Sequence, residues 1–299
     1  MYLHPAPMNC ASISSSATHW AARPVARMLL VVLCAAYSDI ARADDVSPWD
    51  GDARSAARVI AGTRPADRGA PLRAGIEIRL MTGWHTYWRY PGDAGVPPQF
   101  DFAGSQNLKA VEVLWPAPRR LQEAGLDTIG YERGVILPLS VTPQDSAKPV
   151  TLRLKLDYAV CEKLCVPAEA KGELTLTGGP ATQDAALAAA EARVPRKAAL
   201  GEGRGLAVRA VRREDATPHA RIVVDVEAPA GAAVDLFAEG PSPQWALPVP
   251  VAVEGAAAGL KRFTFELDGA PPGTKYEGAV LRLTAVADGK AIDVPFRLD

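Results

Sequence analysis

The stretch LDYAVCEKLCVPAEA, residues 156–170, carries two cysteines, Cys161 and Cys165, between two segments with the composition of β-strands. On an extended strand, residues four positions apart lie about 13 Å from each other, whereas a disulfide needs Cα atoms within roughly 7 Å. If the two cysteines are bridged, the chain must therefore turn between them. CEKLC would then form the bend between a strand over residues 150–160 and a second strand over 171–177.

Segments on both sides of this stretch show the alternation and the aromatic content of strands. GIEIRLM, which begins at Gly75, alternates apolar and polar residues, the pattern of a half-buried strand. WHTYWRY follows it and is rich in aromatic residues that favour strands. Further strand-like segments are LKAVEVLWP, VILPLSV, VTLRLKLDYAV and GELTLTG. The lead-in over 44–70 has no firm period, and we expect one edge strand in it, around Ala57–Gly62. Short strands separated by turn residues predict an antiparallel sandwich.

The second half of the chain repeats this pattern after a single helical segment. DAALAAAEARVP, residues 184–195, is rich in residues that favour helices and ends at Pro195. Strand-like segments then resume, and we expect a second β-sandwich from about residue 200 to the end. This half has no Cys and one His, His219, which favours a supporting or docking role.

The predicted fold class is therefore all-β, with two β-sandwich domains joined by a short helical linker. The sequence pattern places the cysteine-bearing sandwich over residues 44–180, the helical linker over 181–199 and the second sandwich over 200–299. Residues 1–43 are predicted to be a signal peptide and to lie outside the fold.

The N-terminal residues have the organisation of a secretory signal peptide. Arg23 and Arg27 precede an apolar run over Met28–Tyr37, and the small residues Ala41 and Ala43 mark a cleavage signature at its end. We expect cleavage near Ala43 and a soluble product, because no later run reaches the roughly 18 apolar residues that a membrane span needs. The net charge of −1, with both signs mixed along the chain, gives no electrostatic reason to expect nucleic-acid binding.

Cleavage would remove Cys10 and Cys34 and leave only the close pair, for which three kinds of chemistry are open. A structural staple is one, but closing so short a ring stabilises a fold by only roughly 2 kcal/mol. A structural zinc site needs four ligands and finds no second Cys pair. Cu(I) accepts two thiolates, Cys161 and Cys165, with His85 as a candidate third ligand. The third chemistry is thiol–disulfide exchange through a mixed disulfide, which suits a close dithiol in an oxidising compartment and needs no cofactor.

Three motifs occur together in a fixed order: GWHTYWRYPGDAGVPP at 83–98, IGYERGVILPLSV at 129–141 and LDYAVCEKLCVP at 156–167. In this order they resemble the N-terminal periplasmic domain of the DsbD/ScsB family of thiol:disulfide interchange proteins. The resemblance implies an immunoglobulin-like fold and a periplasmic location. It also implies a redox pair at Cys161 and Cys165, with Cys165 as the attacking thiol.

The resemblance implies two partners for this pair. A membrane-embedded donor of the DsbD/ScsB or CcdA type would supply electrons, and a periplasmic thioredoxin-like client would receive them. The associated processes are cytochrome c biogenesis and copper tolerance. Three residues separate the cysteines here, whereas the best-known DsbD domains have five, and this places the chain nearer the ScsB-like branch. The sequence leaves open whether the protein is an enzyme, a protein-disulfide reductase, or instead a Cu(I)-binding protein or a scaffold with a structural disulfide.

The family resemblance also implies a cap loop over the cysteine pair. The matching stretch here runs from about Leu126 to Tyr131, just before Glu132. Asp127 and Glu132 are predicted to disfavour the thiolate by their charge. Ile129 belongs to the same predicted cap and thiol environment.

Two further aromatic positions complete the predicted thiol environment. Tyr158, three residues before the first cysteine, is a candidate to pack against the sulfurs, although a strand aromatic in the core is equally consistent with its position. Strand alternation places His85 on the same face as Tyr87 and opposite Trp84 and Trp88. We interpret these aromatics mainly as core and rim residues.

Overall fold

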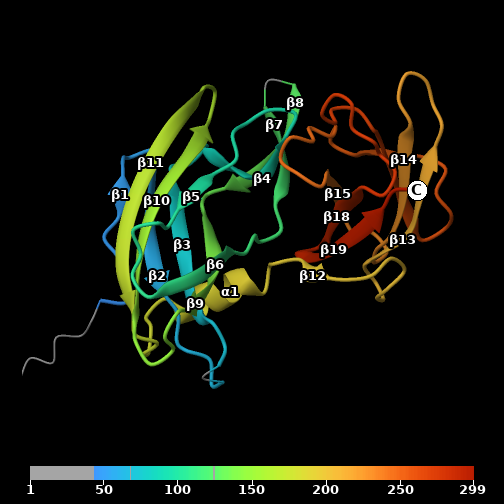
Figure 1. The fold of residues 1–299 in the computed structure, drawn as a ribbon. Helices are drawn as coiled ribbons and strands as arrows, with labels where there is room; N and C mark the ends of the chain where they lie inside the picture. The colour runs from blue at the N-terminus through green and yellow to red at the C-terminus, as the bar shows by residue number, and fades with distance from the viewer. Residues whose placement is uncertain (1–43, 68, 124) are drawn as a thin grey trace, which may run out of the picture. The chain divides into compact units, whose positions relative to one another are not determined.

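The computed structural model describes residues 44–67, 69–123 and 125–299, so the predicted signal peptide and its cleavage site lie outside the described residues. Strands make up most of the described chain, and α1 (Asp184–Glu191) is the single α-helix within it (Figure 1). The predicted all-β fold is confirmed. The helix ends at Glu191 rather than at Pro195. In the part of the chain that the structure describes, no helix is both long enough and apolar enough to cross a membrane.

The first two sheets are formed by residues 50–176. One has the order β1-β2-β3-β9-β6, and its strands are β1 (Asp50–Gly51), β2 (Ser55–Ala61), β3 (Leu72–Leu80), β9 (Val135–Pro143) and β6 (Leu108–Val113). The other has the order β11-β10-β4-β8-β7, and its strands are β11 (Cys165–Leu176), β10 (Val150–Cys161), β4 (His85–Gly92), β8 (Leu126–Glu132) and β7 (Arg119–Glu123). The short β5 (Gln99–Asp101) pairs with β10.

The second two sheets are formed by residues 196–297. One has the order β12-β19-β18-β15, and its strands are β12 (Arg196–Lys197), β19 (Lys290–Arg297), β18 (Val280–Ala287) and β15 (Val234–Glu239). The other has the order β13-β14-β17-β16, and its strands are β13 (Ala207–Glu214), β14 (Arg221–Glu227), β17 (Leu260–Glu266) and β16 (Val251–Val253). All pairs in these sheets are antiparallel except β12 with β19.

The alternation of VTLRLKLDYAV explains how β10 holds the first two sheets together. Leu152, Leu154, Leu156 and Tyr158 are buried in the core, whereas the residues that alternate with them, such as Arg153 and Lys155, point to the outer face. Burying large aliphatic side chains of this kind stabilises the fold by roughly 1.5–3 kcal/mol each. The same alternation places Cys161 on the outer face of the sheet, where Tyr87 and Ala159 bury it apart from the main core.

One strand differs from the sequence expectation, and the predicted linker helix packs on the sheets. The strand expected at Ala57–Gly62 is β2, and it pairs with β3 on one side and with the two-residue β1 on the other, so it is not an edge strand. The helix α1, which lies in the predicted linker, packs against the first two sheets. Its Leu187 is fully buried, and Arg73 of β3 forms ion pairs with Asp184 and Glu191 at its two ends. The division into two domains and a linker stays a prediction.

Candidate redox site

The two cysteines close the hairpin formed by β10 and β11. Cys161 and Cys165 are directly paired across the hairpin, their Cα atoms are 4.1 Å apart, and a disulfide joins them. The loop between them contains Glu162, Lys163 and Leu164. The chain therefore turns within CEKLC, as the spacing predicts, but the returning strand begins at Cys165 rather than at residue 171.

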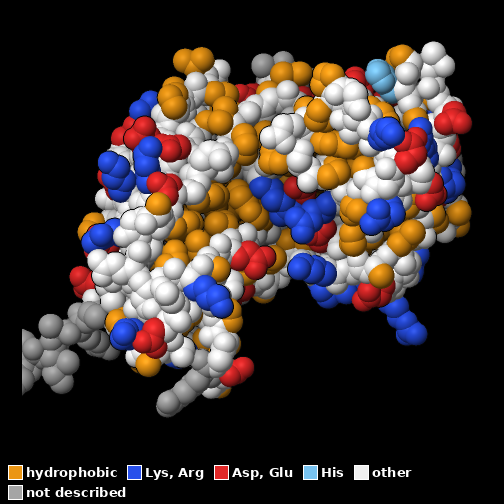
Figure 2. Space-filling model, in the orientation of Figure 1, with side chains coloured by type: hydrophobic (Ala, Val, Ile, Leu, Met, Phe, Trp, Pro, Cys, Tyr) orange, Lys and Arg blue, Asp and Glu red, His pale blue; other side chains and the backbone are white. Residues whose placement is uncertain are grey.

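The hairpin presents the disulfide unevenly to solvent. Cys161 is fully buried, whereas Cys165 is exposed. Leu164 at the tip is 74% exposed, and Figure 2 shows apolar side chains at this end of the hairpin. β11 is the edge strand of its sheet, which is why Pro167 is tolerated opposite Ala159. Because Cys165 is the exposed member of the pair, an incoming group reaches its sulfur first.

β4 supplies two side chains to the outer face on which the disulfide lies. His85 is the strand partner of Cys161, and partners across an antiparallel pair share a face. Tyr87 follows two residues later on that face, and the rings of His85 and Tyr87 meet edge to face with centroids 5.4 Å apart. The predicted common face of these two residues is therefore confirmed. The hydroxyl of Tyr87 lies 3.0 Å from the sulfur of Cys165.

The loop after β4 fixes the position of the Tyr87 ring. Gly95 has φ +111°, a conformation that residues with a side chain rarely adopt. A Cβ atom at this position would lie 2.4 Å from the ring of Tyr87. The absence of a side chain at Gly95 therefore allows the loop to cover the ring and to hold its hydroxyl beside the sulfur.

Glu123, the last residue of β7, contacts every other member of the site. Its Oε1 lies 2.7 Å from the sulfur of Cys161 and 2.8 Å from that of Cys165. Its Oε2 accepts a hydrogen bond of 3.1 Å from the hydroxyl of Tyr87 and lies 3.3 Å from Nε2 of His85. β7 is separated from β10 by β8 and β4 in the sheet order, so the end of β7 reaches over the outer face of β4.

This arrangement places a carboxyl group where the proton of a thiol would go. The sulfurs of a disulfide carry no hydrogen, so in the oxidised state neither can donate to Oε1. After reduction each thiol would have an acceptor within hydrogen-bond distance. Burial, and secondarily the charge of Glu123, raises the pKa of Tyr87 well above its ordinary value, so the phenol keeps its proton and acts as a donor.

Most residues of the predicted cap lie away from the sulfurs. The segment from Leu126 to Tyr131 is part of strand β8 and is not a loop. Ile129 and Tyr131 are buried in the core, and the hydroxyl of Tyr131 donates to the carbonyl of Pro116. Asp127 forms an ion pair with Arg120. Ile129, Tyr131 and Asp127 therefore have partners other than the sulfurs, and a cap role for this stretch stays a prediction.

The two remaining predicted residues also make no contact with the sulfurs in the described structure. Tyr158 lies on the face of β10 opposite to Cys161, and its hydroxyl is 2.6 Å from Oγ of Ser55. Its packing against the sulfurs is excluded by strand alternation. Glu132 is paired with His85 in the register of β4 and β8, but its side chain is exposed.

Glu123, the central residue of the site, is not among the residues that the sequence pattern predicts. One sequence signal could have pointed to it: Gly125, a residue typical of tight turns, follows two positions later. A turn between two strands places the last residue of the first strand at the end of the sheet, as CEKLC does for Cys161. The covering group therefore comes from residue 123, a few positions before the predicted cap.

Three possible metal ligands also meet here. The ligand atoms of His85, Glu123 and Cys161 lie within 4.8 Å of one another. A soft thiolate and an imidazole suit Cu(I), whereas a carboxylate suits harder ions. The two cysteines become thiolate ligands only when the disulfide is reduced.

The fold and the site together define a class of protein: an all-β, immunoglobulin-like sandwich with a disulfide at an open hairpin end. Residues 57–177 match the family model described as "Thiol:disulfide interchange protein DsbD, N-terminal". This part of the chain is a DsbD-alpha-like domain, as the three sequence motifs predict. The family and the Cys161–Cys165 disulfide support thiol–disulfide interchange as the general chemistry of the site.

A solved structure shows the same fold over a longer stretch. The crystal structure of the N-terminal periplasmic domain of ScsB from Proteus mirabilis superposes with a TM-score of 0.66 and 21% sequence identity. The match covers 85% of this chain and 98% of that chain, so it extends beyond residues 57–177 into the second two sheets. The sequence matches no curated protein.

Proposed function

We propose that this protein is a periplasmic thiol–disulfide interchange protein that relays reducing equivalents through Cys161 and Cys165 to thioredoxin-like clients. The observation that carries the proposal is the uneven disulfide at the hairpin end, with one buried sulfur, one exposed sulfur and a carboxyl group against both. A purely structural staple requires neither the exposure nor the carboxyl group.

The exposure of Cys165 and the burial of Cys161 support an order for the two thiols. In the reduced protein the thiolate of Cys165 attacks a client disulfide, forms a mixed disulfide and releases one client thiolate. The thiolate of Cys161 then attacks the sulfur of Cys165, which reforms the Cys161–Cys165 disulfide and releases the second client thiolate. Two electrons pass to the client, and each released thiolate takes up a proton. A membrane-embedded donor would return two electrons to the pair.

Glu123 is placed to restrain the two thiols between exchanges. A thiol must lose its proton before it attacks, and the carboxylate of Glu123, whose Oε1 is within reach of both sulfurs, disfavours the thiolate by its charge. The hydroxyl of Tyr87 and Nε2 of His85 hold the other carboxyl oxygen, which keeps Oε1 directed at the sulfurs.

A trapping experiment tests the relay. The Cys161→Ala variant keeps the attacking thiol but lacks the resolving one, so it should accumulate a covalent complex with a periplasmic thioredoxin-like protein. The Cys165→Ala variant, which lacks the exposed thiol, is the matched control and should trap far less. The relay would lose its main support if neither variant gave an adduct that a reductant releases.

The reduction potential of the pair separates the relay from a structural scaffold. Equilibration with glutathione or dithiothreitol buffers should give a value between roughly −120 and −270 mV, the range of exchange catalysts. A value below about −300 mV, where structural disulfides typically lie, would instead assign the bond to a scaffold.

Cu(I) binding is a second candidate function, favoured by the proximity of His85 and Glu123 to Cys161. The reduced pair and His85 would supply two thiolates and one imidazole, a donor set that Cu(I) accepts. Titration of the reduced protein with Cu(I) against a competing chelator should then show one ion per chain. The His85→Ala variant should bind more weakly, and Glu123→Gln is the control that keeps the soft donors. Binding unaffected by replacing both cysteines would contradict this function.

A further inference from the structure

Both strands that surround the disulfide with side chains are also attached to the second two sheets. β4 carries His85 and Tyr87, and it continues into Arg89 and Tyr90, which contact residues beyond position 200. β7 carries Glu123, and three residues earlier it carries Arg120. The cysteines themselves are on a different element, the hairpin of β10 and β11.

Arg120 joins β7 to the second two sheets and also to β8. Its Nη2 donates to Oδ1 of Asp235 at 2.7 Å and to the carbonyl of Pro250 at 2.7 Å, and its Nε also faces Asp235. Its Nη1 donates to Oδ2 of Asp127 in β8 at 2.6 Å. A planar guanidinium held on several sides loses little further freedom, so this contact fixes β7 closely.

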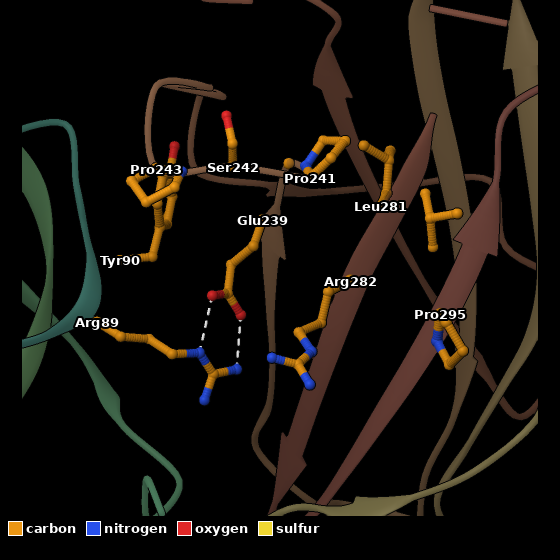
Figure 3. Close-up of a pocket in the computed structure, with 11 residues that line it drawn as sticks. Arg89, Tyr90, Glu239, Pro241, Ser242, Pro243, Leu281, Arg282 and Pro295 are labelled. Carbon is orange, nitrogen blue, oxygen red and sulfur yellow. Dashed lines mark hydrogen bonds and ion pairs between the residues drawn. The ribbon is translucent and has the colours of Figure 1, made fainter. Parts of the chain in front are cut away.

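β4 is held by a second ion pair and by aromatic contacts. The guanidinium of Arg89 binds both carboxyl oxygens of Glu239 (Figure 3), with N–O distances of 2.8 and 2.6 Å. The hydroxyl of Tyr90 donates to the carbonyl of Leu247, and the ring of Trp88 lies against that of Phe237 with centroids 5.8 Å apart. Bidentate pairs of this kind set geometry as well as adding energy.

We propose that the junction formed by Arg120 with Asp235 and Arg89 with Glu239 positions the side chains that control the two thiols. Through this junction the second two sheets set how closely Glu123 approaches the sulfurs. Asp235 and Glu239 are thus positioning residues, because they act through β7 and β4 and touch neither sulfur. The second two sheets therefore have a role in thiol reactivity although they carry no cysteine.

The proposal predicts a change in reactivity at a distance. Replacing Asp235 by Asn removes the charge that holds Arg120 and allows the end of β7 to move. Glu123 then spends less time beside the sulfurs, and the thiolate form, which a nearby carboxylate disfavours, becomes more populated. A fall of one unit in the thiol pKa raises the thiolate population about tenfold, so a fall of about half a unit raises it about threefold. Alkylation of the reduced pair by iodoacetamide at pH 7 should therefore accelerate by about threefold or more.

Three further variants separate positioning from simple stabilisation. Asp225→Asn is the matched control: this aspartate is also held by arginines within the second two sheets, but it is outside the junction. It should lower the melting temperature and leave the alkylation rate unchanged. Glu239→Gln should accelerate alkylation as Asp235→Asn does. In a Glu123→Gln background the effect of Asp235→Asn should disappear, because the group through which it acts has lost its charge.

Two results would overturn the proposal. One is an unchanged alkylation rate in Asp235→Asn with a loss of melting temperature like that of the control. The other is an equal acceleration by Asp235→Asn whether or not the Glu123→Gln substitution is present, which would mean that Asp235 does not act through Glu123. The biological meaning of this proposal rests on the proposed function, but its test does not, because alkylation needs neither client nor donor. A failed relay would show in the trapping experiment and in the reduction potential instead.

Discussion

Glu123 and Asp225 are both shielded carboxyl groups on strands, and their surroundings differ in one respect. Asp225, in the central strand β14, binds Arg262 at 2.6 and 2.9 Å and Arg212 at 3.1 Å. Glu123, at the end of the edge strand β7, meets two sulfurs, a phenol and an imidazole, and no arginine is among the partners the structure gives it. The carboxylate of Asp225 is committed to ion pairs with guanidinium groups, whereas the carboxylate of Glu123 is left to interact with the two sulfurs.

The largest expected difference between the two groups is in stability. Asp225→Asn should lower the free energy of unfolding by roughly 1–3 kcal/mol, because it leaves two guanidinium groups without their charged partner. Glu123→Gln should change it by no more than about 0.5 kcal/mol. Urea unfolding of both variants measures this, with the slope of the transition as a check that the unfolding mechanism is unchanged. Equal losses of unfolding free energy in the two variants would contradict the distinction between a structural and a functional carboxyl group.

The next difference is in thiol reactivity, and it runs in the opposite direction. Removing the charge of Glu123 should make the reduced pair react with iodoacetamide about three to ten times faster at pH 7, because the nearby carboxylate no longer disfavours the thiolate. Asp225→Asn should leave the rate unchanged. A slower reaction in Glu123→Gln would instead mean that the carboxylate acts mainly by removing the thiol proton.

The contribution of Asp225 to the free energy of unfolding should decrease in acid, within a defined pH range. The hydrogen bond from Arg262, and then that from Arg212, lowers the pKa of Asp225 below its ordinary value of 3.8. The unfolded chain therefore takes up this proton first, so the stability from Asp225 is present above pH 3.8 and is lost as pH falls through the lower folded pKa. The difference in unfolding free energy between the protein and Asp225→Asn should accordingly shrink below about pH 4. A difference constant down to acid pH would contradict this account.

The smallest expected effect comes from the phenol that Glu123 and Cys165 share. Tyr87→Phe keeps the ring beneath Gly95 but removes the hydroxyl that donates to Glu123. The change in unfolding free energy should be about 1 kcal/mol or less, as for one partly buried hydrogen bond. Alkylation should change by no more than about twofold, since the carboxylate charge remains. A change as large as that of Glu123→Gln would make Tyr87, and not Glu123, the controlling residue.

Several parts of the site follow from local sequence. The alternation of VTLRLKLDYAV predicts β10, and the spacing of the cysteines predicts the turn that CEKLC makes. The same alternation along WHTYWRY places His85 and Tyr87 on one face. These predictions succeed because strand geometry repeats every two residues and needs no knowledge of distant neighbours.

Other predicted residues lie away from the sulfurs. Tyr158 takes the core position that the sequence equally allowed, because three positions along a strand put it on the face opposite to Cys161. Asp127 and Ile129 were expected in a cap, but the pairing of β8 with β4 and β7 directs them elsewhere.

By itself, then, the sequence determined the all-β class, the hairpin that holds the cysteines and the resemblance to DsbD N-terminal domains, since each depends on local periodicity, local turns or contiguous motifs. The tertiary structure decided that Glu123, which lies 38 positions before Cys161, supplies the carboxyl group beside both sulfurs. It also decided that Arg120 and Arg89 attach the strands of the site to the second two sheets. The physical reason is that the order of strands in a sheet and the path of their ends are set by non-local packing, which no local pattern encodes.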